Sequence, residues 1–176
     1  MENKNKGDFL KHYEPVHHQF CKFCRAITGN PEDSEDLIQD SILNVLESFD
    51  KIKDLAVFKS YLYSVASNLN KMKRRRHKFK ADFNETEVQK IVDLGQNQEH
   101  LTDFKIIYEK ILSLPEKTAE TIILFHISDL SLEEIQKIQG GSLSAVKSRL
   151  TRGREKVLSL LTTKTQVNMA LTLFTL

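Results

Sequence analysis

Apolar residues recur at spacings of three and four along most of this chain, which is the pattern of amphipathic helices. The runs extend from Phe9 to Ile27, from Pro31 to about Phe49, from about Phe58 to Arg76, and again across a second unit from about Leu101 to Leu161. Only 6 glycines and 3 prolines occur among 176 residues, so few positions break a helix or make a tight turn. The pattern predicts an all-α protein.

The runs fall into two small helical domains joined by a flexible linker. Residues 1–79 hold three predicted helices, enough to enclose one core, and residues 80–104 are polar and acidic with room for one short helix. Residues 105–161 form the second, four-helix domain, which contains a helix-turn-helix. The sequence leaves four interpretations of the apolar tail, residues 162–176. It packs on the second domain, contacts a partner protein, continues the last helix or is a frayed end.

Charge is strongly segregated although the net charge is only +2. The segment 68–80 is basic and has no carboxylate, 142–164 is basic with one acid, and 32–54 is acidic. Such asymmetry indicates one polyanionic and one basic partner. The polar N-terminus, the two cysteines and the lack of an apolar run of about 18 residues lead us to expect a cytoplasmic protein.

The helix-turn-helix is marked by its caps. Ser131 and Glu134 form a capping box, Gly140–Gly141 ends the short helix, and Ser142 can cap the next one. The second helix carries a connected basic and hydroxyl face suited to phosphates and base edges. A solvated outer face would have the same composition, so the capped turn is what favours DNA binding.

Two stretches resemble the bacterial extracytoplasmic-function (ECF) sigma factors of the sigma-70 family. The family's C-terminal, promoter-reading domain is matched by LSLPEKTAETIILFHISDLSLEEIQKIQGGSLSAVKSRLTRGREKVLSLL. Its first domain is matched by GNPEDSEDLIQDSILNVLESF followed by FKSYLYSVASNLNKMKRRR. The matches have the family's order and spacing, and cover residues 9–79 and 105–161.

The resemblance implies an alternative sigma factor that binds core RNA polymerase and directs transcription from promoters with −35 and −10 elements. The residues that match the family's contact with the clamp coiled coil of the largest polymerase subunit are Asp36, Gln39 and Asp40. Those expected at the −10 region are Tyr61, Asn68, Lys71, Lys73, Arg74, Arg75 and Arg76. Those expected at the −35 element are Ser142, Ser144, Lys147, Ser148, Arg149, Thr151 and Arg152. An anti-sigma factor is a further expected partner.

The chain departs from the family in two places. Tyr61 stands where the family usually has tryptophan, and Gly141 stands where it commonly has an apolar residue, so a looser turn is expected. Arg149 can pair locally instead of touching DNA. We find no catalytic constellation, phosphate loop or metal motif, and expect neither enzyme activity nor a cofactor.

Three alternatives remain open from the sequence. A self-standing helix-turn-helix regulator would bind DNA without polymerase, and a sigma-like protein could act by sequestering a partner. His17, Cys21 and Cys24 share one helix face and could bind a metal or sense redox state, although one helix rarely supplies the four ligands of a zinc site. Cys24 also fits a small buried apolar residue.

Overall fold

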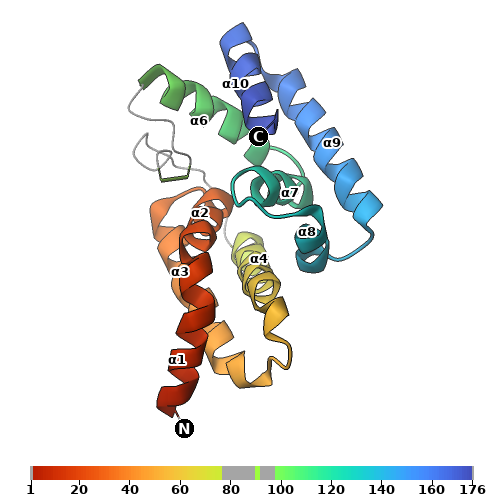
Figure 1. Cartoon of the computed structure of the whole chain (residues 1–176). Helices are drawn as coiled ribbons and strands as arrows, with labels where there is room; N and C mark the ends of the chain where they lie inside the picture. The colour runs from red at the N-terminus through yellow and green to blue at the C-terminus, as the bar shows by residue number, and fades with distance from the viewer. Residues whose placement is uncertain (1, 77–89, 92–97, 176) are drawn as a thin grey trace.

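The computed structural model describes residues 2–76, 90–91 and 98–175, and every regular element within these ranges is a helix. The all-α prediction is confirmed. Two groups of helices are stacked end to end, with the N-terminus at the far end of the first group and the tail helix on the second (Figure 1).

The first domain contains four α-helices and three short 3-10 helices. They are α1 (Glu2–Tyr13), η1 (Glu14–Val16), α2 (His17–Thr28), α3 (Pro31–Ser48), η2 (Phe49–Lys51), η3 (Leu55–Val57) and α4 (Phe58–Arg76). The prediction of a single helix from Phe9 to Ile27 is wrong, because the 3-10 helix at Glu14–Val16 separates α1 from α2. Pro15 has no backbone N–H to continue the hydrogen-bond ladder.

Gly29, Asn30 and Pro31 in the sequence predict a helix stop followed by a helix start, and the structure confirms both. Gly29 has a φ of +85°, a left-handed conformation that suits glycine. The Asn30 side chain accepts a hydrogen bond from the backbone N–H of Asp33 at 2.8 Å, and Pro31 is the first helical residue. These two caps turn the chain so that α2 packs on α3.

Aromatic rings fill the first core. Phe9 lies 5.7 Å from both Phe49 and Phe58, and the Phe20 ring lies 5.4 Å from that of Tyr63. We expect at least Phe58 of the aromatic residues near the start of α4 to be packed, and it is buried. The apolar spacing of this helix in the sequence also includes Met72, but its side chain is 49% exposed near the end of α4 and does not join the core.

The second domain is built from five helices. They are α6 (Gln98–Leu112), α7 (Glu116–His126), α8 (Leu132–Gln139), α9 (Leu143–Leu160) and α10 (Lys164–Thr175). Helix α6 begins inside the predicted linker, and it buries Leu101 and Phe104 there. Most of the remaining linker lies outside the described residues, although Ile91 is described and buried.

The apolar tail packs on the second domain. Helix α10 contacts α6 and α9, and the ring of Phe174 lies 5.1 Å from that of His126. Leu161–Thr163 separate α9 from α10, so the tail is a separate helix and not a continuation. Of the four possibilities, packing on the second domain is the one observed.

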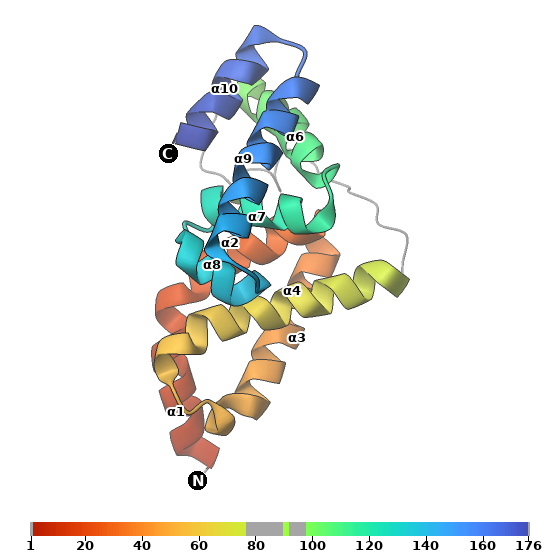
Figure 2. The same ribbon diagram turned by 90° about the vertical axis from the view of Figure 1, so that its right-hand side faces the viewer.

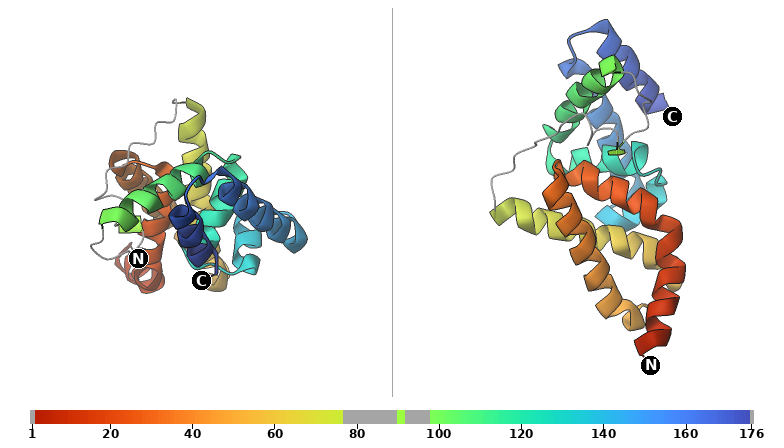
Figure 3. Two further views of the ribbon diagram at one scale, coloured as in Figure 1. Left: turned by 90° about the horizontal axis from the view of Figure 1, so that it is seen from above. Right: turned by 90° about the vertical axis from the view of Figure 1, so that its left-hand side faces the viewer.

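The two domains pack closely on each other. Helix α8 lies on α4, and α7 contacts α2 (Figure 2). The Tyr108 hydroxyl of α6 donates a buried hydrogen bond to the carbonyl oxygen of Ala26 in α2. The buried apolar residues of both domains form one continuous cluster, while α1 points away from the second domain (Figure 3). The packing therefore fixes how the faces of α3, α4 and α9 are placed.

Candidate nucleic-acid and partner interfaces

The exposed face of α3 is acidic. Asp36, Gln39 and Asp40 are all exposed and lie together, as the sequence predicts, while Leu37 on the opposite side is fully buried. Leu43, one turn further along the same face, is 54% exposed. An exposed apolar side chain on an acidic helix face suits a basic helical partner that also has an apolar contact.

An open pocket of about 510 Å³ lies between the end of α3 and the start of α4, beside the loop that joins them. It is lined by Ser48, Lys51, Ile52, Lys53, Asp54, Val57 and Tyr61. The Asp54 carboxylate accepts a hydrogen bond from the N–H of Ala56 at 2.9 Å, which fixes the rim of the loop. Tyr61 is 36% exposed, and Asn68 is exposed two turns further along the same face of α4. The pocket can take a flat ring against the tyrosine.

The basic end of α4 is only partly open to a ligand. Lys71 lies 3.5 Å from the Glu120 carboxylate, and Lys73 lies 3.2 Å from that of Asp36. Arg74 is half-buried and Arg75 is exposed. Arg76 is the last residue of the helix, and its side chain, like Lys78 and Lys80 of the predicted basic run, lies outside the described parts.

The helix-turn-helix has the predicted caps. Ser131 and Glu134 complete the capping box, and the Ser142 hydroxyl accepts from the N–H of Ala145 at 3.1 Å. Gly140 and Gly141 have φ values of +69° and +89°, so the backbone itself requires glycine at both positions. The Gln136 side-chain amide donates to the Gly141 carbonyl at 3.0 Å, which ties down the turn that lacks the family's apolar anchor.

The outer face of α9 is presented to solvent. Ser144, Lys147, Ser148, Thr151 and Arg152 are exposed, and Ser142 is exposed at the cap. Val146 and Leu150 are buried beneath them. The predicted −35 residues are therefore brought together on one face, except for Arg149.

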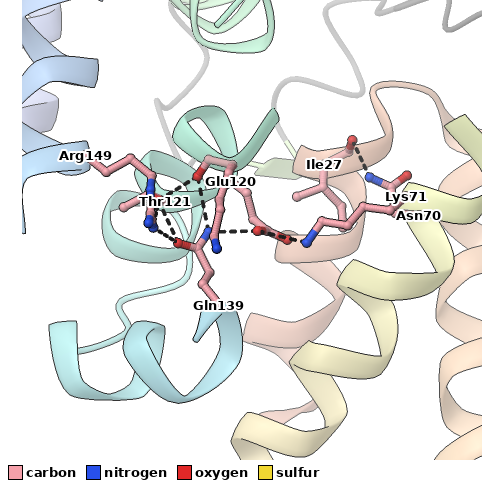
Figure 4. Close-up of polar contacts among 8 residues, drawn as sticks. Ile27, Asn70, Lys71, Glu120, Thr121, Gln139 and Arg149 are labelled. Atoms are coloured by element: carbon pink, nitrogen blue, oxygen red, sulfur yellow. Dashed lines mark hydrogen bonds and ion pairs between the residues drawn. The ribbon is translucent and has the colours of Figure 1, made fainter. Parts of the chain in front are cut away.

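Arg149 turns inward into a polar network (Figure 4). Its guanidinium donates to the side-chain oxygen of Gln139 and lies 3.5 Å from the Thr121 hydroxyl. The Gln139 amide donates to the Glu120 carboxylate at 2.7 Å, and Lys71 reaches the same carboxylate from α4. The network therefore extends from α9 through α8 and α7 to α4.

A second ion pair joins the domains at the other end of α8. Lys59 at the start of α4 lies 2.9 Å from one Glu134 carboxylate oxygen, and the Ser131 N–H donates to the other at 2.8 Å. Burial raises the pKa of the Glu134 carboxyl, but the hydrogen bonds from Lys59 and Ser131 outweigh it, and the net pKa lies below its ordinary value.

The cysteines of α2 are buried. Burial raises the pKa of both thiols, that of Cys24 most strongly, which disfavours the reactive thiolate. The His17 ring lies 3.8 Å from the Cys21 sulfur, and its Nδ1 is 2.8 Å from the Tyr13 hydroxyl. Among the residues that the structure describes, no three His, Cys, Asp or Glu side chains are grouped closely enough to hold a metal ion.

Sequence analysis did not identify Glu120 and Glu134 as the acids that form ion pairs with the lysines of α4. Glu120 lies within the buried stretch Ala119–Leu124, and a carboxylate in an apolar run is the signal that could have indicated a buried partner. Glu134 was recognised only as a cap. Its second oxygen is free to pair with Lys59, which no local pattern reveals.

Comparison with known proteins gives two family matches. Residues 12–80 match the model for sigma-70 region 2, and residues 104–157 match the model for sigma-70 region 4. None of the described helices is both long and apolar enough to cross a membrane.

Individual relatives agree with these matches. The chain is 30% identical over 147 residues to the ECF RNA polymerase sigma factor SigW of Bacillus subtilis, covering 76% of this chain and 78% of that protein. It is 24% identical to the ECF sigma factor EcfG of Rhodopseudomonas palustris, covering 79% and 77%. The sigma factor RpoE of Bartonella quintana, solved with the anti-sigma factor NepR, shares the fold with a TM-score of 0.67 and 21% identity, covering 87% of this chain and 96% of that one.

Proposed function

Because the chain belongs to the ECF sigma factors of the sigma-70 family, and is an alternative sigma factor that directs promoter-specific transcription, we propose that three helical faces divide this task. The acidic face of α3 docks core RNA polymerase, the pocket and outer face of α4 take the −10 element, and the exposed face of α9 reads the −35 element. The observation that carries the proposal is the separation of an acidic face and a basic face on one closely packed chain.

Polymerase docking falls to Asp36, Gln39 and Asp40. Their carboxylates and amide face solvent on one side of α3, where they can meet a basic helical partner such as the clamp coiled coil. Complementary charge of this kind sets association rate and register more than final affinity.

Opening of the −10 region falls to α4. An unstacked base fits the pocket beside Tyr61, with the Asn68 amide placed on the same face to contact a neighbouring base edge. Extracting a base costs a few kcal/mol, which stacking on an aromatic ring at about 1–3 kcal/mol per base can offset. Lys71, Lys73 and the arginines Arg74–Arg76 then hold the phosphates.

Reading of the −35 element falls to α9. Lys147 and Arg152 suit phosphates and guanine edges, and Ser144, Ser148 and Thr151 suit shorter hydrogen bonds. Arg149 is held by Gln139, so we assign it to positioning of α9 against α8 in place of direct readout. We further propose a cytoplasmic site of action and control by an anti-sigma factor, since the RpoE neighbour was solved with one.

The experiment is run-off transcription with purified core polymerase and a cognate promoter. Asp40→Lys should abolish core binding and transcription, because it puts a cation against a basic partner. Glu14→Lys makes the same charge change at an exposed site on η1 and should leave both intact. If Asp40→Lys binds core polymerase as the wild type does, the docking assignment is wrong.

A further inference from the structure

Helix α10 lies outside the part of the chain that matches the sigma-70 family. The match to region 4 ends at residue 157, whereas α10 spans Lys164–Thr175. The helix lies beside α6 and α9 and packs on both (Figure 1). It buries Gln166, Ala170 and Phe174, which are four residues apart and so share one face. A packed helix beyond the family match has a role that membership of the family does not supply.

The end of α10 closes over His126 of α7. The Phe174 ring lies 5.1 Å from the imidazole, and His126 also forms a hydrogen bond with the backbone of Leu173. Phe174 is buried, so water is excluded from that side of the imidazole. Two consecutive residues of the tail therefore fix the position of one ring on α7.

The same imidazole holds Arg154 of α9, the helix whose outer face carries the proposed −35 residues. The imidazole Nε2 accepts a hydrogen bond from the Arg154 Nε at 2.9 Å. The Arg154 guanidinium carbon lies 5.3 Å from the centre of the Phe125 ring, a second contact with α7. Because Nε2 accepts, the proton of the neutral imidazole is on Nδ1. His126 thus connects the tail helix to α9.

Helix α9 is held on α7 at three points. Arg149 lies 3.5 Å from the Thr121 hydroxyl (Figure 4), and Gly153 lacks a side chain where α9 crosses close to Ile122. These two positions are one turn apart on a single face, so they leave α9 free to roll about its own axis. Arg154 projects about 100° around the helix from Gly153. Its contact with the imidazole is therefore the one that resists rolling.

We propose that α10 is a positioning element for −35 recognition: the tail fixes the His126 ring, the ring holds Arg154, and this contact sets the roll of α9. The inference rests on the proposed function, in which Lys147, Thr151 and Arg152 meet DNA. A roll of α9 displaces these side chains together. Hydrogen bonds to base edges depend on position more than phosphate contacts do, so loss of the tail contact should reduce promoter discrimination more than overall affinity.

The test measures promoter discrimination by holoenzyme assembled from core polymerase and the full chain. Two fragments of the promoter used for run-off transcription compete for the holoenzyme, and they differ by one base pair in the −35 element. The ratio of the two affinities cancels any loss of folded protein or of core binding, because both fragments meet the same holoenzyme. One base pair should change the wild-type affinity by about tenfold.

Phe174→Ala removes the ring that packs on the imidazole and should lower this ratio from about tenfold to about threefold or less. Leu171→Ala is the matched control, because this leucine belongs to the same helix and is 44% exposed. The control should keep the wild-type ratio. Equal ratios for the two variants overturn the proposal.

Substitutions of His126 test the connection to Arg154 directly. His126→Phe keeps an aromatic ring against Phe174 but offers no acceptor to the Arg154 N–H, so it should lower the ratio as Phe174→Ala does. His126→Gln supplies a side-chain oxygen that can accept from Arg154 and should restore most of the wild-type ratio. An unreduced ratio for His126→Phe overturns the positioning role, as does a ratio for His126→Gln that is equally low.

Amide hydrogen exchange of α9, measured on the free chain without DNA, separates this inference from the proposed function. The α9 amides of Phe174→Ala should exchange faster than those of Leu171→Ala, because α9 loses one of its three contacts with α7. If wild-type holoenzyme shows no discrimination, the assignment of α9 to the −35 element fails, and exchange still reports whether the tail holds α9. Equal exchange in the two variants overturns the inference by itself.

Discussion

Lys73 of α4 and Asp36 of α3 form an ion pair, with the lysine Nζ 3.2 Å from the carboxylate oxygen. One partner is a residue proposed for DNA and the other is proposed for polymerase. The side chains are 33% and 62% exposed, so solvent weakens the pair and a stronger partner can break it. Docking of polymerase on Asp36 would then release Lys73 for DNA.

Lys73→Gln should tighten binding of core polymerase by about twofold to fivefold, because no ion pair with Asp36 then has to break before polymerase binds. Lys137→Gln, at an exposed site on α8, removes the same charge and should leave affinity unchanged. The measurement is core binding by anisotropy of the labelled sigma factor. Equal affinities for these two variants would show that the pair does not compete with polymerase.

Leu43→Ala should weaken core binding about tenfold, because an exposed leucine among docking carboxylates can act as the apolar anchor of that interface. The side chain is 54% exposed, so the free energy of unfolding should change little. Leu10→Ala removes a leucine that is 48% exposed on α1 and serves as the control. A loss of affinity in both variants would contradict a specific role for Leu43.

Gly153→Ala should lower the free energy of unfolding by about 1–2 kcal/mol. A Cβ at this position would lie 2.8 Å from Thr118 Cγ2 and 2.9 Å from Ile122 Cδ1, where α9 crosses α7, and overpacking costs more than the gain in helix propensity. Gly7→Ala in α1 has nothing within 4 Å and should be neutral or slightly stabilising. Urea unfolding compares them, and equal effects would show that the crossing relaxes freely.

Acid should loosen the tail helix through His126. Burial, with the nearby Arg154 charge, lowers the pKa of His126 from 6.5 to about 4. The imidazole accepts from Arg154 Nε at 2.9 Å and lies against Phe174, so the folded state requires the neutral ring. The unfolded chain binds a proton more readily, and stability should fall as the pH drops from 6.5 towards 4.

The loss should be on the order of 2 kcal/mol, allowing for partial exposure of the ring. His126→Gln removes the titration and should flatten the stability profile over this pH range. His18→Gln, at an exposed position on α2, is the control and should keep the wild-type slope. A wild-type slope in the His126 variant would place the acid sensitivity elsewhere.

Interactions between residues close together in the sequence account for much of what the sequence by itself determined, namely the helix caps and the exposed helix faces. Asn30, Ser131 and Ser142 cap their helices as predicted, because a cap depends on a side chain and a backbone amide only three residues apart. The exposed faces of α3 and α9 follow from helical periodicity in the same way. The two sigma-70 matches were recognisable for the same reason, since their motifs are local.

Only the tertiary structure decided which polar side chains already have a partner within the chain. Arg149 is turned inward by Gln139, and the lysines of α4 meet Glu120 and Glu134 from more than forty residues away. The tail packs as α10 because α6 and α9 present an apolar surface to it. Such pairings depend on how the domains pack, and a helix's own sequence shows only which face is polar, not which partner covers it.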